Sequence, residues 1–331
     1  MDIFKKIYQQ AKVEPKNIVL PEGEDLRILQ AAAYTANKKL AKIIVLGKPG
    51  IINNLAKKNK INLSKVEILQ PSQDQAKEKY IETYAQLQKH RGITPGQARE
   101  FLLSNFVFYA AMMVRQGAVD GFVAGACHTT SDVARAALQC IPRLADQMTM
   151  SGSFLININD QRFGEAGLFL FADCAIVPTP TSKQLANIAL SSAEVWTKIT
   201  NYQARLAMLS FSTKGSSSAE PIIRVRQATE LAKTAKQDLI IDGELQLDSA
   251  IVPEVAKIKA PDSPIAGRAN ILIFPNLDAG NIAYKLLQRL AGARVVGPLI
   301  QGLAKPGSDL SRGCGVEEIT DAIVVTAVRA Q

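Results

Sequence analysis

The sequence has few of the residues on which many metal and disulfide sites are built. It contains only two histidines, His90 and His128, and four cysteines, Cys127, Cys140, Cys174 and Cys314. The cysteines are widely spaced and form no C-x-x-C pair, so a structural zinc site and a disulfide framework are both disfavoured. We expect reduced thiols, a cytoplasmic protein and no metal.

Long apolar runs are also missing. No run reaches the roughly 18 apolar residues that a membrane-spanning helix needs. The first 17 residues, MDIFKKIYQQAKVEPKN, lack the apolar core of a secretory signal and instead predict a short amphipathic helix. The sequence therefore predicts neither a membrane protein nor a secreted one.

Acidic residues are scarce in one part of a chain whose formal net charge is +9. Residues 38–65 contain eight lysines and no acid. Aromatic residues, on which nucleic-acid bases stack, are few in this segment, so a solvated surface explains the lysines better than a nucleic-acid site. The charge is compatible with a small anionic substrate.

The common nucleotide and hydrolase motifs are absent. The sequence has no G-x-x-x-x-G-K-[ST] loop, no complete G-x-G-x-x-G fingerprint after a strand, no G-x-S-x-G elbow and no H-E-x-x-H pair. P-loop enzymes and nicotinamide dehydrogenases are therefore disfavoured.

Short apolar runs that alternate with helical patterns are what the chain has in abundance. At 331 residues, two domains are expected. Strands that are apolar on both faces predict an α/β fold with mostly parallel sheets. We expect strands at 18–22, 42–47, 66–69, 120–125, 153–159, 168–177, 205–213, 238–245, 269–276 and 294–300. Helices are expected at 181–200 and through much of 74–117. The predicted domains are 1–145 plus 296–331, and 146–295.

Three junctions between a strand and a helix carry unusual numbers of polar residues. In the first, at 125–139, Thr130, Ser131 or Asp132 can cap the helix. Arg135 is predicted in the first turn, where a cation opposes the helix dipole, and an anion bound at the helix N-terminus would remove the conflict. The second, at 209–221, presents Ser212 and Thr213, and a flexible polar loop explains it nearly as well.

The third junction, at 301–319, reads QGLAKPGSDLSRGCGVEEI. Arg312 precedes a helix predicted to start near Val316, again the wrong end for a cation unless an anion binds there. Gly313 and Gly315 permit close backbone approach to a ligand. With Gly315 as the N-cap, Glu318 occupies the position of a capping-box acid, although it could instead be a general base.

Other candidates have simpler explanations. Arg91 precedes Gly92, as expected for a basic residue at a helix C-terminus. Cys174 and Cys314 could accept an acyl group, but most isolated buried cysteines are small hydrophobic residues.

Over essentially its whole length the sequence resembles the phosphate acetyltransferase (phosphotransacetylase) family in its short form, within the phosphate acetyl/butyryl transferases. The segments that carry the resemblance are IVLPEGEDLRILQAA (18–32), GACHTTSDVARAALQ (125–139), FADCAIVPTPTSKQLANIALSSAEVW (171–196), RLAMLSFSTKGS (205–216), the run 241–290, and GPLIQGLAKPGSDLSRGC (297–314). The resemblance implies a two-domain α/β/α sandwich, a homodimer, and an active site in the interdomain cleft.

The resemblance also implies the reaction and its residues. Acetyl-CoA and phosphate would be interconverted with CoA and acetyl phosphate in a ternary complex, without a cofactor. Glu318 would deprotonate CoA, Ser311 would stabilise the oxyanion, and Arg312 would bind phosphate. The further residues expected to bind phosphate or CoA are Arg91, Arg135, Thr130, Ser131, Tyr284, Ser212 and Thr213.

Three positions depart from the commonest family pattern, which has Asp at Glu318, Ser at Gly315 and Pro at Ala136. Alternative functions are a phosphate propionyl- or butyryltransferase, a non-catalytic regulatory domain of this fold, and a dehydrogenase of isocitrate-dehydrogenase-like architecture. The retained Ser311, Arg312 and Glu318 disfavour the regulatory domain, and the missing nucleotide motif disfavours the dehydrogenase.

Overall fold

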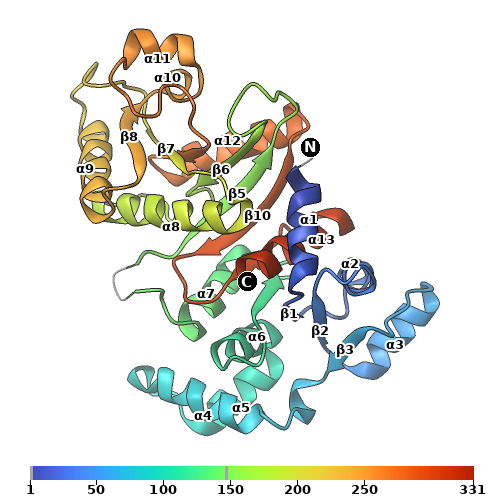
Figure 1. Cartoon of the computed structure of the whole chain (residues 1–331). Coiled ribbons are helices and arrows are strands. Elements are labelled where there is room, and N and C mark those ends of the chain that lie inside the picture. Colours follow the sequence, from blue (N-terminus) through green and yellow to red (C-terminus); the bar gives the residue numbers. More distant parts are fainter. Residues whose placement is uncertain (1–2, 146–147) are drawn as a thin grey trace. The chain divides into compact units, whose positions relative to one another are not determined.

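The computed structural model describes residues 3–145 and 148–331, and the chain divides into two compact units (Figure 1). Unit 1 comprises Met1–Leu144 and Leu303–Gln331, and unit 2 comprises Ala145–Gly302. The return to unit 1 thus falls after residue 302, whereas the sequence analysis placed it after residue 295. The difference arises because strand β10 (Arg294–Gln301) pairs with strand β5 (Ser151–Asn157) of unit 2.

Unit 1 contains a parallel sheet with the strand order β3-β2-β1-β4-β11. The strands are β1 (Asn17–Leu20), β2 (Lys42–Leu46), β3 (Val66–Leu69), β4 (Gly121–Ala124) and β11 (Gly307–Asp309). Strand β11 was not predicted, because its Gly-Ser-Asp sequence has no apolar residue. It forms as a buried neighbour of β4, with Ser308 paired to Val123.

Eight α-helices belong to the described part of unit 1. They are α1 (Ile3–Val13), α2 (Leu26–Asn37), α3 (Pro49–Lys58), α4 (Lys77–Leu87), α5 (Pro95–Ser104), α6 (Phe106–Arg115), α7 (Thr130–Cys140) and α13 (Val316–Arg329). Helix α1 is the predicted amphipathic helix. Two short 3-10 helices, η1 (Pro71–Gln73) and η2 (Lys89–Arg91), also belong to this unit. The first and last helices pack together (Figure 1), and the Tyr8 hydroxyl donates to Asp321 Oδ1 at 2.7 Å.

Capping signals in the sequence explain where several helices of unit 1 begin. Thr94 and Gln97 form a capping box at α5, and Asp25 caps α2 by accepting from the Arg27 amide.

Unit 2 contains a mixed sheet with the strand order β10-β5-β6-β9-β7-β8. Its remaining strands are β6 (Leu168–Ala172), β7 (Arg205–Leu209), β8 (Ile240–Leu245) and β9 (Ile271–Ile273). Strands β6, β9, β7 and β8 are parallel, whereas β5 is antiparallel to both β10 and β6. The expected α/β fold with mostly parallel pairing is confirmed, and the antiparallel pairs at β5 are the exception.

The helices described in unit 2 are α8 (Ser182–Thr200), α9 (Glu220–Ala235), α10 (Leu247–Ile251), α11 (Pro253–Lys259) and α12 (Leu277–Leu290). Helix α8 was predicted at 181–200, and a Thr181–Gln184 capping box fixes its start. Its Trp196 is fully buried, as the apolar spacing required. Among residues 3–145 and 148–331, no helix is long and apolar enough to cross a membrane.

Candidate active site

Three loops of unit 1 follow strands that are neighbours in the sheet. They come after β1, β4 and β11, and the third of them contains Ser311 and Arg312. The helices that follow the second and third loops carry Thr130, Ser131 and Glu318 near their starts. Because the three strands are parallel, their carboxyl ends share one edge of the sheet, which is where α/β proteins place their ligands. We call this group of loops, residues 21–25, 125–129 and 310–315, the strand-end site.

Glu22 joins the first loop to the second. Its side chain is only 1% exposed, and its carboxylate accepts backbone N–H groups from Gly125, Ala126, Cys127 and His128 at 2.8–3.1 Å. The sequence predicts a possible bound anion at the N-terminus of the helix that follows this loop. In the structure an internal carboxylate already accepts those four groups, so a ligand must use other donors.

Arg27 joins all three loops. Its Nη1 donates to the carbonyl oxygens of Arg312 and Cys314, both at 2.9 Å, and its Nη2 donates to the carbonyl oxygen of Ala126 at 3.0 Å. The same guanidinium forms an ion pair with Asp25 at 2.7 Å. Burial acts to raise the pKa of Asp25, but the hydrogen bonds from Arg27 outweigh it and keep that pKa below its ordinary value.

Asp309 lies at the end of β11 beneath the second loop. Burial raises its pKa to about 7, and the charge of Glu22 adds to the effect. Within the described residues neither carboxylate oxygen has a hydrogen bond of normal geometry, although the Thr130 hydroxyl and the Leu310 amide favour the charged form. A Cβ at Gly125 would lie 2.2 Å from Asp309 Oδ1, so only glycine permits this approach.

The N-terminus of α7 differs from the expectation. Thr129 is the N-cap and accepts from the Asp132 amide at 3.2 Å, whereas Thr130, Ser131 and Asp132 had been considered for that role. The helix therefore begins at Thr130, and the side chains of Thr130 and Ser131 are not used as caps. Arg135 lies in the second turn rather than the first, is exposed, and approaches Asp132 to 3.6 Å. Its conflict with the helix dipole is correspondingly weaker.

The third loop presents the Ser-Arg pair. Ser311 and Arg312 are exposed, and the Cys314 amide donates to the Ser311 carbonyl at 2.9 Å, which closes a turn between the two. Glu318 Oε2 accepts from the Gly315 amide at 2.7 Å at the start of α13. The predicted helix start and the capping contact of Glu318 are therefore observed, and this contact leaves its second oxygen, Oε1, outside the cap.

Arg91 is placed elsewhere in unit 1. It ends η2, and Gly92 follows it in the left-handed conformation with φ 73°, as its sequence context predicted. Burial raises the pKa of Tyr84 to about 12, and the positive charge of Arg91 acts to lower that pKa. The Tyr84 hydroxyl lies 3.4 Å from Gln139 on α7. This places Arg91 by α4 and α7 rather than in the three loops.

Three predicted binding residues belong to unit 2. Ser212 donates to Glu244 Oε1 at 3.0 Å, and the Thr213 hydroxyl contacts Gln246 and Ser249. Both residues are buried, so their hydroxyls bind within the unit. The Tyr284 ring stacks on Phe154 with the ring centroids 4.1 Å apart.

The cysteines are poor nucleophiles in this setting. Burial raises the pKa of Cys314 to about 11 and raises that of Cys174 well above its ordinary value. Cys127 is exposed as a residue, yet partial desolvation raises its pKa to about 11 as well. All three are therefore thiols at neutral pH, which disfavours covalent acyl transfer.

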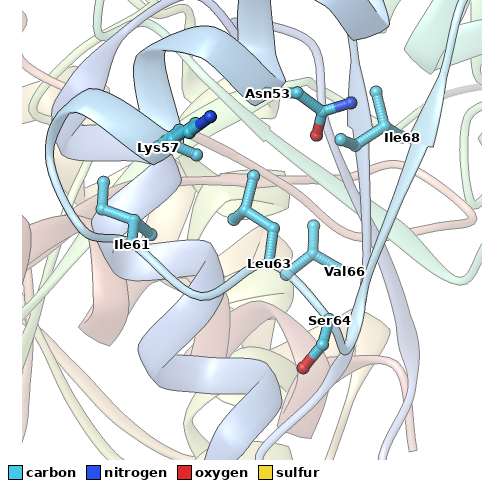
Figure 2. Close-up of a pocket in the computed structure, with 8 residues that line it drawn as sticks. Asn53, Lys57, Ile61, Leu63, Ser64, Val66 and Ile68 are labelled. Atoms are coloured by element: carbon cyan, nitrogen blue, oxygen red, sulfur yellow. The ribbon is translucent and has the colours of Figure 1, made fainter.

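A separate surface cavity lies at the far edge of the unit 1 sheet. It has a volume of about 450 Å3, and Figure 2 shows Asn53 and Lys57 on one side of it and Ser64, Val66 and Ile68 on the other. Its walls are α3, β3 and the loop between them. None of the predicted site residues lines this cavity.

The strand-end site of this α/β protein presents exposed side-chain donors for an anion close to two helix N-termini. Comparison with known proteins agrees. The family model for phosphate acetyl/butaryl transferase matches residues 2–327. The phosphate acetyltransferase of Thermoanaerobacterium thermosaccharolyticum is 46% identical over 331 residues, which is 100% of both chains.

Two solved structures are also similar over almost their whole length. The EutD phosphotransacetylase from Staphylococcus aureus is 38% identical with a TM-score of 0.90, covering 100% of this chain and 98% of that one. A phosphotransacetylase from Streptococcus pyogenes is 39% identical with a TM-score of 0.91, covering 99% and 98%. The chain belongs to the phosphate acetyl/butyryl transferase family.

Glu22, Arg27 and Asp309 were missed by reasoning from the sequence. Glu22 lies two residues after the end of β1, and that position was the available signal. Arg27 lies at the start of α2 and Asp309 ends the unpredicted strand β11, so neither had such a signal. Their partners are distant in sequence: Arg27 and Arg312 are 285 positions apart, and Glu22 and Gly125 are 103 positions apart.

Proposed function

We propose that the chain is a phosphate acetyltransferase that interconverts acetyl-CoA and phosphate with CoA and acetyl phosphate. The observation that carries the proposal is the exposed Ser311–Arg312 pair, held by Arg27 at the carboxyl edge of a parallel sheet. Full-length identity of 46% to a phosphate acetyltransferase supports the acetyl group as the one transferred.

In the proposed mechanism the reaction is a direct transfer in a ternary complex. Glu318 takes the CoA thiol proton, whose ordinary pKa is about 8.5 for a thiol of this kind. The thiolate attacks the acetyl carbonyl, and Ser311 donates to the oxyanion that develops there. Arg312 binds the phosphate, because a guanidinium matches two phosphate oxygens at once.

The N-terminus of α7 adds further phosphate contacts in this proposal. Ser131 is exposed at the second residue of the helix, and Thr130 precedes it. Arg135 and Arg91 would add positive charge when substrate is bound. For Tyr284, Ser212 and Thr213 a substrate contact stays a prediction, and the internal hydrogen bonds of the two hydroxyl residues favour a role in shaping their loop.

This chemistry needs neither a metal nor a redox cofactor, because only protons and an acetyl group change places. CoA and acetyl-CoA act as substrates. We expect the reaction to run in the cytoplasm, where the four free cysteines would stay reduced. Turnover should be unchanged by a metal chelator.

A homodimer is the assembly that we propose. Helix α12 packs Ala279, Ala283 and Leu287 against the core of unit 2, yet it exposes Ile282, Leu286 and Leu290 at a spacing of four residues. Such an apolar stripe suits a second copy of the chain. Ile282→Asp should lower the mass measured by light scattering, whereas Ile51→Asp, an exposed isoleucine on α3, should not.

The enzyme assay uses purified protein, CoA and acetyl phosphate and follows thioester formation. Turnover that does not exceed a heat-inactivated control would overturn the proposed activity. The same assay with propionyl and butyryl phosphate ranks the acyl groups, and acetyl phosphate should give the highest kcat/KM.

A further inference from the structure

The His128 side chain is bound to the buried carboxylate of Glu22. The distance from His128 Nδ1 to Glu22 Oε1 is 2.8 Å. The two side chains differ in exposure, at 38% for His128 and 1% for Glu22. The pair thus has a buried acidic end and a solvent-accessible imidazole, the arrangement by which carboxylates orient catalytic histidines.

The hydrogen bonds of Glu22 fix the tautomer of His128. Oε2 accepts from the amides of Gly125 and Ala126, and Oε1 accepts from the amides of Cys127 and His128. With two N–H donors on each oxygen, Glu22 is an acceptor and leaves no place for a carboxyl proton. Nδ1 of His128 must therefore carry hydrogen, and Nε2 is the nitrogen that remains for chemistry.

His128 also lies in the right loop. It precedes Thr129, the N-cap of α7, and lies two residues after Ala126. The Arg27 guanidinium donates both to the carbonyl oxygen of Ala126 and to that of Arg312. The loop that carries His128 is therefore tied directly to the loop that carries Ser311 and Arg312. Among the described residues no hydrogen bond to His128 Nε2 is present.

We propose that His128 is the acid–base residue on the phosphate side of the reaction, with Nε2 giving a proton to the phosphate oxygen that leaves the acetyl group. This inference rests on the proposed function. If the bond between the acetyl carbon and the phosphate oxygen broke without proton transfer, the phosphate would leave fully deprotonated. Fully deprotonated phosphate is a strong base and a poor leaving group. A positioned general acid removes that difficulty.

The step balances as follows. The thiol proton of CoA goes to Glu318, the sulfur–carbon bond forms, and the bond between the acetyl carbon and the phosphate oxygen breaks. That oxygen takes the Nε2 proton of His128, so the products are acetyl-CoA and hydrogen phosphate. Exchange with solvent then returns a proton to His128 and removes one from Glu318. In the reverse direction His128 is the base that activates hydrogen phosphate.

Charged groups lie on more than one side of His128. Glu22 lies on one side, and Asp132 of α7 is near enough to interact with the imidazole electrostatically. The pKa of Asp132 is lowered first by the Thr129 hydroxyl and then by Arg135 and His128. Asp309 interacts electrostatically with Glu22, and Arg27 donates to the carbonyl oxygen of Ala126. Two carboxylates thus face the ring, with Arg135 the opposing cation.

The alternative is that His128 only satisfies a buried carboxylate as a fifth donor. His128→Asn separates the two roles, because the asparagine amide can replace Nδ1–H toward Glu22 but has no group in place of Nε2. His128→Ala removes both. We expect the two variants to lose kcat equally, by roughly 100-fold or more, while only the alanine variant loses thermal stability.

The pH profile gives a second readout. A general acid has to carry its proton, so the wild-type kcat for thioester formation should fall at alkaline pH, and His128→Asn should lack that limb. An asparagine variant with kcat within about threefold of wild type, or with an unchanged alkaline limb, would overturn the role of His128. An inactive wild type would instead overturn the proposed function, so the two failures are distinguishable.

Discussion

The Nη1 of Arg27 donates to the carbonyl oxygen of Arg312 at 2.9 Å, so a residue at the start of α2 fixes the backbone of the Ser-Arg loop near the other end of the chain. A single guanidinium makes this bond, a second to Cys314, a third to Ala126 and an ion pair with Asp25. A planar fork can serve all of these partners, whereas an ammonium group cannot.

Arg27→Lys should therefore lower kcat for thioester formation by roughly tenfold or more, because the loop that carries Ser311 and Arg312 loses its support. A matched control is Arg162→Lys. Arg162 pairs with Asp160 two positions before it, as Arg27 pairs with Asp25, but it is 80% exposed. Equal activity of both variants and wild type would contradict the positioning role of Arg27.

Glu318→Gln should separate catalysis from capping. The glutamine oxygen can still accept from the Gly315 amide, so the melting temperature should stay near that of wild type. Loss of the base should lower kcat by roughly 100-fold or more while CoA still binds. The control is Gln184→Ala, which removes the capping side chain of α8 alone and should change stability rather than kcat. Near-normal kcat in the glutamine variant would leave Glu318 as a cap only.

Asp309 should make the stability of the protein depend on pH. Burial raises its pKa from 3.8 to about 7, so the folded protein keeps a proton that the unfolded chain has already released. Its contribution to the free energy of unfolding is therefore present below about pH 4 and is lost as the pH rises to about 7. The full difference is on the order of 4 kcal/mol.

Asp309→Asn should abolish that loss. Urea unfolding of the variant and the wild type at about pH 5 and about pH 8 should show the asparagine variant gaining stability relative to wild type at the higher pH. Ionisable groups that are present in both proteins contribute equally to the two unfolding free energies, so their effects cancel when the wild-type value is subtracted from that of the variant. A difference in unfolding free energy that does not change with pH would show that Asp309 is charged in the folded state.

Cys314→Ala should cost little activity, although Cys314 lies two residues after Arg312. Its pKa of about 11 leaves a thiolate fraction on the order of 10⁻⁴ at neutral pH. We expect kcat within about threefold of wild type and slow alkylation of Cys314 by iodoacetamide. Accumulation of an acetylated enzyme that the alanine variant cannot form would contradict direct transfer.

Local patterns predicted much of the fold. All ten expected strands are present, since buried strands of α/β sheets are recognisable as short apolar runs. The start of α13 after Gly315 and the capping contact of Glu318 were also predicted, because a cap depends on residues only three positions apart.

Other features escaped because they depend on long-range pairing. Strand β11 has no apolar pattern and exists as a strand only beside β4. The cap of α7 is one residue earlier than the three candidates, since Thr129, Thr130 and Ser131 are equally able to cap and the sequence does not distinguish them. The predicted boundary of unit 2 differs from the observed one for a related reason. The sequence does not show which strand β10 pairs with, and its pairing with β5 assigns it to unit 2.

The sequence by itself determined the α/β class and the positions of the ten apolar strands, because these follow from apolar periodicity, and motif resemblance singled out the Ser311–Arg312 pair. Only the tertiary structure decided that Glu22 occupies the amides of the loop after β4, that Arg27 holds the Ser-Arg loop, and that Asp309 is buried behind Gly125. These contacts join residues more than a hundred positions apart, and their energies depend on burial that no local pattern encodes. The orientation of His128 belongs with them, since it is set by a carboxylate 106 positions earlier in the chain.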